Sequence, residues 1–138
     1  EVSNWARTPA ARCRHNLLYW QGGDWWGLGP GAHSHVGGVR WWNVKHPTTY
    51  AGRLAAGVSP GHGREVLSAT DRYVEDVMLR LRLASGLPLA GLDDVGRAGA
   101  VRAAADGLLE QEAYAEGRAV LTLRGRLLAD AVVRQLLP

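Results

Sequence analysis

The sequence changes character near residue 46, and this change constrains the fold more than any other feature. All six tryptophans and four of the five histidines lie at or before this point. After it the chain is rich in alanine, leucine, valine and arginine, with apolar residues at helical spacing. We therefore predict two units of different architecture, residues 1–45 and residues 67–138. A connecting helix and linker, residues 46–66, are expected between them.

Length and charge limit the class of protein. A chain of 138 residues can bury one modest core, or one domain and a remnant of another. It carries 16 basic and 13 acidic residues, a net charge of +3, with no run of like sign. Lys45 is the only lysine, so the basic character comes from arginine spread along the chain. We therefore expect no nucleic-acid partner.

The cysteine count and the lack of long apolar stretches exclude further classes. Cys13, the one cysteine, cannot form an internal disulfide or supply a cysteine-rich zinc or iron–sulfur site alone. This fits a reducing compartment, and we expect a cytoplasmic protein. No apolar stretch approaches the roughly 20 residues of a transmembrane helix, and no signal-peptide pattern is present. The opening residues, 1–6, read as the interior of a protein, so we expect a fragment.

The first unit shows signals for short strands around one helix. We predict a strand over Val2–Ala6 and a helix over Arg12–Trp20 that ends at the glycine pair after it. A second strand, Trp25–Gly29, runs into a glycine loop, and a third covers Val39–Trp42. The order strand, helix, strand predicts an α/β arrangement in this part, with further strands needed to complete its sheet.

The connecting segment and the next helix follow from local signals. Pro47 begins a short helix that ends near Ala56, and residues 58–64 are predicted to be a linker. Ser68 is the predicted N-cap of a helix, with Asp71 in the capping-box position. The apolar stripe of this amphipathic helix is Val74, Val77, Met78 and Leu81, and the helix is expected to end near Gly86.

The last third predicts a small, mostly helical domain. An alanine-rich helix covers Val95–Leu109, a two-strand hairpin lies within residues 108–123, and a final helix covers Leu127–Leu137. Helix, helix, hairpin, helix is a winged-helix-like order, which makes the whole chain α+β. Arg124 and Arg126 would lie on the wing, so a nucleic-acid-binding module is the least favoured alternative.

The segment Arg14–Trp20 carries the most ligand and stacking chemistry in the chain. In a helix, His15 and Tyr19 lie one above the other because they are four residues apart. A neutral imidazole ligates iron or zinc, and an indole such as Trp20 can wall a flat ligand. Arg12 and Arg14 could meet the propionates of a haem. The alternative is that His15 caps a helix or bonds to a backbone carbonyl.

A second candidate site is the glycine loop that begins at Gly27. Gly29 and Gly31 follow at alternate positions, and glycine lets a backbone approach a ligand closely. His33 and His35 come next and would share one face of an extended segment, although we expect one to pack and one to face solvent. The spacing is not that of the dinucleotide fingerprint, and a tight strand-end turn is an equal alternative.

These segments together resemble a known family. The matching blocks resemble the C-terminal part of the oxygen-independent coproporphyrinogen III oxidase-like radical-SAM proteins, of the haem-chaperone (HemW) type. The specific blocks are residues 1–6, 14–20 and 27–34, and further similarity lies at Trp42-Asn43, Tyr50, Val77–Leu83, Gly86-Leu87 and Leu121–Gly125.

The resemblance implies a fold and a site. The fold would be the last piece of a radical-SAM partial (β/α) barrel, followed by a small helical domain. The family's His-Asn-x-x-Tyr-Trp motif is associated with haem binding. It maps onto His15, Asn16, Tyr19 and Trp20, with His15 as the candidate ligand of the haem iron.

The resemblance also implies cofactors and partners. The family's [4Fe-4S] cluster and S-adenosylmethionine need a three-cysteine motif that this chain lacks, so the chain alone should be inactive. The expected partners are haem or a porphyrin, a haem-accepting protein and a second copy of the protein. The alternative function is that of a coproporphyrinogen III dehydrogenase, which decarboxylates propionates in porphyrin biosynthesis.

Overall fold

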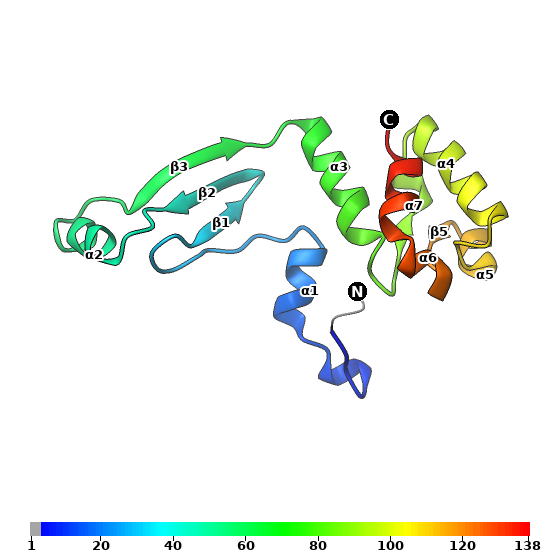
Figure 1. Ribbon diagram of the computed structural model, residues 1–138, viewed down its shortest axis with the longest axis horizontal. Coiled ribbons are helices and arrows are strands. Elements are labelled where there is room, and N and C mark those ends of the chain that lie inside the picture. Colours follow the sequence, from blue (N-terminus) through cyan, green and yellow to red (C-terminus); the bar gives the residue numbers. More distant parts are fainter. Residues whose placement is uncertain (1–3) are drawn as a thin grey trace. The chain divides into compact units, whose positions relative to one another are not determined.

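The computed structural model describes residues 4–138, and the chain forms two compact units. We call Gly23–Arg72 the sheet unit, because it contains the three-stranded sheet (Figure 1). We call the residues up to Gly22, together with Tyr73–Pro138, the helical unit. The α+β class is confirmed. The boundaries of the expected segments, after residues 45 and 66, stay a prediction. Among the described residues, none of the helices combines the length and the apolar character needed to cross a membrane.

The sheet unit is an antiparallel meander of β1 (His33–Val36), β2 (Val39–Asn43) and β3 (Gly61–Val66). Gly37 and Gly38 join the first two strands with φ values of 59° and 81°. Positive φ at both central residues is what a tight two-residue hairpin requires. Helix α2 (Pro47–Ala55) separates β2 from β3 and begins at its proline, as predicted.

The predictions for the sheet unit were wrong in three respects. Residues 61–66, placed mostly in the linker, form β3 and pair with β2. Trp25–Gly29 is not a strand, because Trp25 makes only an isolated bridge to His35. The strands are antiparallel, so the α/β arrangement is not found. Residues 4–6 contain no strand, and the rest of the strand predicted over Val2–Ala6 lies outside the described residues.

The helical unit is built from short helices around one apolar core. Its helices are α1 (Arg14–Trp20), α3 (Ala69–Arg80, which begins in the sheet unit), α4 (Asp94–Ala105), α5 (Gln111–Ala115), α6 (Leu123–Leu127) and α7 (Ala129–Leu136). Two 3-10 turns, Pro9–Ala11 and Leu89–Gly91, and the two-residue strands β4 (Leu87–Pro88) and β5 (Arg118–Ala119) complete it.

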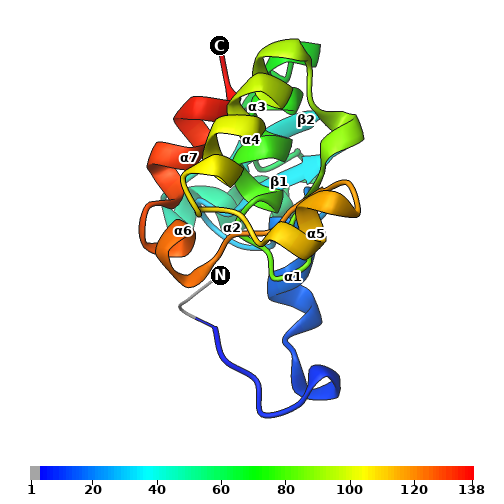
Figure 2. The ribbon, with the colours of Figure 1, turned by 90° about the vertical axis from the view of Figure 1, so that its right-hand side faces the viewer.

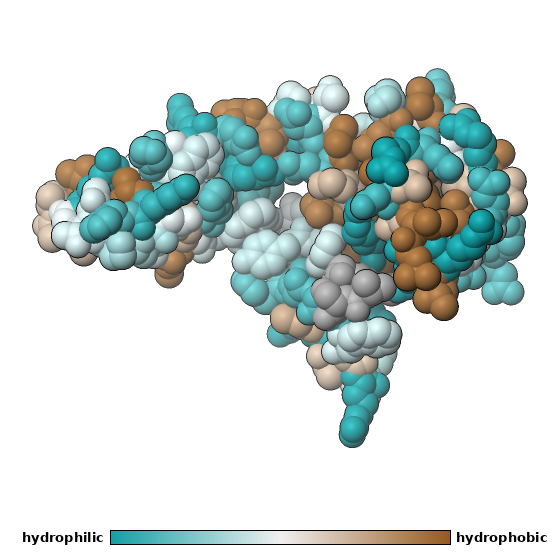
Figure 3. All heavy atoms as spheres, viewed as in Figure 1, coloured by the Kyte–Doolittle hydropathy of each residue, from teal (hydrophilic) through white to brown (hydrophobic). Residues whose placement is uncertain are grey.

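The core is formed by α3, α4, α7 and the segments that connect the helices. Helix α4 packs against α7, and Figures 1 and 2 show the two helices side by side. Its largest fully buried side chains include Leu81, Leu87, Leu109 and Leu136. In contrast, Leu123, Leu127 and Leu128 are exposed apolar residues on and just after α6, and Figure 3 shows apolar surface there. The core therefore uses one face of each helix and leaves the apolar face of α6 uncovered in this chain.

The last third follows the predicted order only in part. The capping box at the start of α3 is confirmed, because the Ser68 hydroxyl accepts from the Asp71 N–H at 3.1 Å. The hairpin predicted within residues 108–123 is confirmed in part. Leu109 and Leu121 form an antiparallel bridge, but α5 and β5 lie between them in the chain, so the two segments are not joined by a simple turn. The predicted last helix is confirmed as α7; a further short helix, α6, precedes it and carries Arg124 and Arg126. A winged-helix-like fold is therefore not confirmed.

Candidate functional site

Helix α1 carries all four residues of the predicted haem motif. It begins after Cys13 and ends at Trp20, and Gly22 beyond it has a φ of 68°, so the predicted helix is confirmed with a start two residues later. The spacing of four residues places His15 with Tyr19 on one row of the helix, and Asn16 with Trp20 on the neighbouring row. One short helix therefore brings the imidazole, the amide and both aromatic rings together.

His15 and Tyr19 are in direct contact. The Tyr19 hydroxyl lies 3.1 Å from Nε2 of His15, and which group donates depends on the imidazole tautomer. The ring centroids are 4.9 Å apart with an interplanar angle of 79°, an edge-to-face arrangement. His15 is exposed and Tyr19 half-buried. The imidazole is thus accessible and hydrogen-bonded within the motif.

The surroundings of His15 fit a haem chemically. A neutral imidazole is a common axial ligand of haem iron. Arg12 and Arg14 are exposed on either side of Cys13, and a guanidinium can bind a carboxylate such as a propionate through two N–H groups. Asn16 and Trp20 are half-buried, so they support the helix and still present part of their surface. The donor set is that of a surface haem contact.

The glycine loop of the sheet unit is held by three polar side chains. The Gly27 N–H donates to the Ser34 hydroxyl at 2.9 Å, and the Gly29 N–H donates to the Tyr50 hydroxyl at 3.1 Å. The Asn43 amide donates to the Gly29 carbonyl at 2.9 Å. Ser34 and Asn43 are buried, with exposed fractions of 0% and 4%. These side chains define the shape of the loop.

The same hydrogen bonds limit what the loop can offer to a ligand. The third glycine, Gly31, donates its N–H to the Val44 carbonyl at 2.9 Å. All three glycine N–H groups therefore already have acceptors within the unit. Gly27 is required for packing, because a Cβ atom there would lie 2.0 Å from the His33 carbonyl oxygen. The loop is a turn held in place by hydrogen bonds within the sheet unit, and its role in ligand binding stays a prediction.

The residues that hold the loop were not among the predicted site residues. Ser34 stands between His33 and His35, so the alternation of a strand could have placed it on the opposite face, toward the interior. Asn43 follows two tryptophans at the end of β2, where a buried amide has no local signal. Tyr50 lies on α2, and its contact with Gly29 is purely tertiary.

His33 and His35 behave differently, as predicted. His33 is exposed and stacks on Trp42, with ring centroids 5.8 Å apart. His35 packs against Trp25 at 5.0 Å, and its Nδ1 lies 3.3 Å from the Gly23 carbonyl oxygen. No set of three or more histidine, cysteine or acidic side chains gathers into a metal site within residues 4–138.

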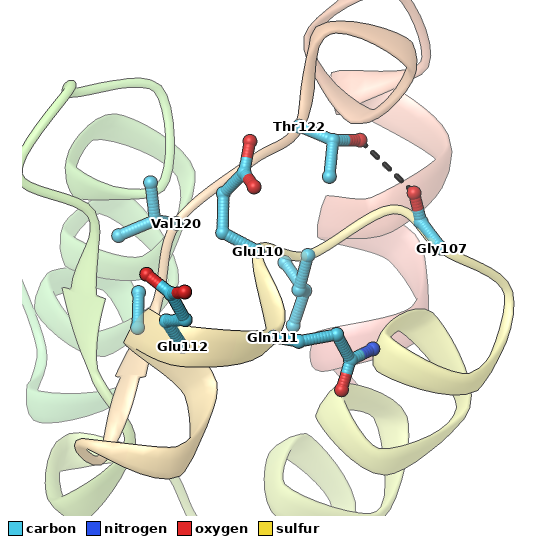
Figure 4. Close-up of a pocket in the computed structure, with 8 residues that line it drawn as sticks. Gly107, Glu110, Gln111, Glu112, Val120 and Thr122 are labelled. Atoms are coloured by element: carbon cyan, nitrogen blue, oxygen red, sulfur yellow. Dashed lines mark hydrogen bonds between the residues drawn. The ribbon is translucent and has the colours of Figure 1, made fainter.

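The helical unit has an open depression of about 590 Å³ beside α5 (Figure 4). Leu109, Ala113 and Val120 contribute apolar surface to it, and Glu110 and Glu112 contribute carboxylates. The Thr122 hydroxyl donates to the Gly107 carbonyl at 3.0 Å across one end of the depression. None of the predicted site residues lines it. The candidate site therefore remains the exposed face of α1.

Comparison with known proteins identifies the type of sequence. The chain is 58% identical to the heme chaperone HemW of Mycobacterium tuberculosis over 137 residues, which cover 99% of this chain and 34% of that protein. The HemW of Synechocystis is 34% identical over 99 residues, or 70% of this chain and 24% of that protein. The chain thus spans about a third or less of the length of these curated relatives. No family model matches the sequence.

The fold is also similar to that of a solved structure. Coproporphyrinogen III oxidase (HemN) from Escherichia coli, a radical SAM enzyme, superposes with a TM-score of 0.60 at 20% sequence identity. The similarity covers 83% of this chain and 28% of that chain. At this identity the likeness is one of fold. Together with the relatives above, it confirms the resemblance drawn from the sequence.

Proposed function

Because this chain is a HemW-type sequence, we propose that it is part of a haem chaperone and that α1 carries its haem-binding motif. The observation that carries the proposal is the exposed imidazole of His15, held beside Tyr19 and close in sequence to two exposed arginines. A haem protein that receives the haem, a cytoplasmic location and a homodimer belong to the same proposal.

Each residue of the motif has a role in this proposal. His15 ligates the haem iron through an imidazole nitrogen. Tyr19 and Trp20 contact the macrocycle through their rings, and Asn16 supplies an amide at its edge. Arg12 and Arg14 bind the propionates. The exposed position of His15 suits a carrier, since haem bound at a surface can be passed on directly.

The sheet unit carries the second candidate site. We include the loop of Gly27, Gly29 and Gly31 with His33 in the proposal as a candidate ligand surface of the sheet unit itself. The support is the exposed His33 ring stacked on Trp42, which presents an aromatic edge beside the loop. The assignment of residues 1–45 to a partial (β/α) barrel belongs to the proposal as well.

S-adenosylmethionine and a [4Fe-4S] cluster are part of the proposal only for the longer protein. Cys13 is exposed and is the one cysteine of the sequence, so these residues cannot supply three cluster ligands. The dehydrogenase alternative is supported by the fold likeness to HemN alone. The chaperone function has the stronger support, because the relatives at 34–58% identity are haem chaperones by name.

The experiment is a haem titration of the full-length protein and two histidine variants. The unsubstituted protein is expected to shift the Soret band, and His15→Ala is expected to lose this shift. His46→Ala is the matched control, because His46 is an exposed histidine that precedes α2. An unchanged titration of His15→Ala would contradict the assignment. Formation of protoporphyrinogen by the reconstituted protein would favour the dehydrogenase instead.

A further inference from the structure

The hydroxyl of Tyr19 occupies Nε2 of His15, one of the two imidazole nitrogens through which a haem iron could bind. Nε2 is the ring nitrogen farthest from the backbone of α1, and the Tyr19 oxygen lies 3.1 Å from it. We infer that the Tyr19 hydroxyl competes with the haem iron for Nε2 of His15, so that haem binding replaces the hydrogen bond at Nε2 with a bond to iron. This inference rests on the proposed function and adds to the same site a residue that favours haem release.

Both tautomers of His15 lead to the same conclusion. If Nδ1 carries the proton, the Tyr19 hydroxyl donates into the lone pair of Nε2, which is the pair that iron binds. If Nε2 carries the proton, it donates to the phenol oxygen, and Nε2 has no free lone pair. In the second case the proton must move to Nδ1 before iron binds. In both tautomers, iron binding through Nε2 requires the contact with Tyr19 to open, with no net change in protonation of the imidazole.

The position of the His15–Tyr19 pair keeps the free-energy cost of breaking this hydrogen bond small. The contact joins residues four apart on a helix of seven residues, and the pair is on the exposed side of the motif. His15 is exposed, so its ring can rotate away from the phenol without opening the apolar core. Exposed side chains change rotamer within nanoseconds, far faster than haem transfer between proteins. The exchange is therefore local to α1.

Competition of this kind suits a carrier. When the iron leaves, the phenol takes back Nε2 and satisfies it, so the empty site is stabilised relative to the loaded one. Tyrosine suits this role in either tautomer, because its hydroxyl can donate to an unprotonated Nε2 or accept from a protonated one. Tyr19 is thus a positioning residue that acts through His15.

The test uses Tyr19→Phe in the full-length protein, with hemin as the probe. Removal of the hydroxyl keeps the ring and deletes the competing contact, so the dissociation constant should fall about three- to tenfold, the range of one net hydrogen bond. Transfer to apomyoglobin should slow by a similar factor. The Soret band should keep its imidazole-ligated position. Tyr114→Phe, which deletes a phenolic hydroxyl from α5, is the matched control and should change neither quantity.

A second measurement separates this role from a structural one. In the haem-free protein, the ¹⁵N chemical shift of His15 Nε2 reports its hydrogen bond directly, and it should move in Tyr19→Phe but not in Tyr114→Phe. Haem binding of Tyr19→Phe that is equal to or weaker than that of the unsubstituted protein would overturn the inference. The proposed function would still stand if His15→Ala loses the Soret shift. It fails by itself if His15→Ala keeps that shift.

Discussion

The two units are stabilised in different ways. In the helical unit, apolar side chains from α3, α4, α7 and the segments that connect the helices form one core in which Leu81 and Leu136 have no exposed surface. In the sheet unit, Ser34 and Asn43 are 0% and 4% exposed, and the buried apolar side chains are Val44 and Leu67, each 8% exposed. Its tryptophans are not buried: Trp25, Trp41 and Trp42 are half-buried and Trp26 is exposed. Apolar burial therefore dominates one unit, and satisfied polar groups define the other.

This difference explains where each unit tolerates change. Apolar burial is non-directional and sums over many contacts, so it stabilises a whole unit. Hydrogen bonds to a loop are directional, and a buried donor or acceptor is costly when it is left without a partner. The stability of the helical unit should therefore depend on the volume of its buried side chains, and that of the sheet unit on single polar atoms. Four substitutions test this contrast.

The largest effect is expected for Leu81→Ala in the helical unit. Leu81 has no exposed surface, so truncation loses transfer free energy and leaves a cavity, which costs about 3–5 kcal/mol. Hydrogen exchange of the helical-unit amides in the intact protein measures this loss. Leu127→Ala is the control, since Leu127 is 77% exposed and should change stability by less than about 0.5 kcal/mol. Equal losses would show that the core does not dominate this unit.

The next effect concerns the contact between α4 and α7. A Cβ atom on Gly99 would lie 1.9 Å from the Gln135 carbonyl oxygen, so Gly99→Ala must push the helices apart, at about 2–3 kcal/mol. In the sheet unit, a Cβ on Gly52 of α2 meets nothing within 4 Å. Gly52→Ala should gain about 0.5–1 kcal/mol from helix propensity. Thermal unfolding should show a lower midpoint for Gly99→Ala and a higher one for Gly52→Ala. A stabilised Gly99→Ala would contradict the close packing of α4 and α7.

Asn43→Ala tests the polar side of the comparison. It leaves the Gly29 carbonyl without its amide donor inside the sheet unit, at an expected cost of about 1–3 kcal/mol. Faster hydrogen exchange at the Gly27 and Gly29 amides is the readout. Thr48→Ala, at an exposed position on α2, should leave these amides unchanged. If the Gly27 and Gly29 amides exchange at the same rate in Asn43→Ala as in the unsubstituted protein, the hydrogen bonds of Asn43 do not define the loop.

The smallest effect is expected at the start of α3. The Ser68 hydroxyl and backbone N–H, which bond to the Asp71 carboxylate, hold the pKa of Asp71 below its ordinary value. A lowered pKa stabilises the fold above the ordinary pKa of 3.8, and this contribution is lost as the pH falls through the lowered pKa. Ser68→Ala should cost about 1 kcal/mol at neutral pH.

An NMR titration checks this cap directly. In Ser68→Ala the pKa of Asp71 should rise toward its ordinary value, because the side-chain hydrogen bond is the largest cause of the shift. Ser85→Ala, at an exposed position after α3, is the control and should leave the titration of Asp71 unchanged. An Asp71 titration that is the same in Ser68→Ala would refute the capping role.

Local signals predicted the elements that depend on neighbouring residues. Pro47 marks the start of α2, Ser68 with Asp71 marks the start of α3, and the glycines after Trp20 mark the end of α1. The Gly37-Gly38 pair is also a local hairpin signal, and it could have placed the turn between β1 and β2. A cap or a tight turn is formed within four residues, so the sequence is sufficient to show it.

The elements that the sequence did not reveal depend on distant partners. β3 contains two glycines and only one β-branched residue, so its composition argues against a strand. It forms because β2 supplies its hydrogen bonds and because Gly63 leaves room for Trp42, whose Cζ2 would lie 2.6 Å from a Cβ there. The hairpin predicted within residues 108–123 was incomplete for the same reason: Leu109 and Leu121 do bridge, but Arg118 and Ala119 pair with the distant residues Pro88 and Leu87.

The sequence by itself determined the relatedness of this chain, the helix that carries His15 and the spacing that places Tyr19 beside it. These follow from the order of residues and from the 3.6-residue period of a helix. The tertiary structure alone decided that Ser34, Asn43 and Tyr50 take up the polar groups of the glycine loop, and that the Tyr19 hydroxyl lies on Nε2 of His15. A hydrogen bond depends on distance and direction between two atoms, and only the folded chain fixes both.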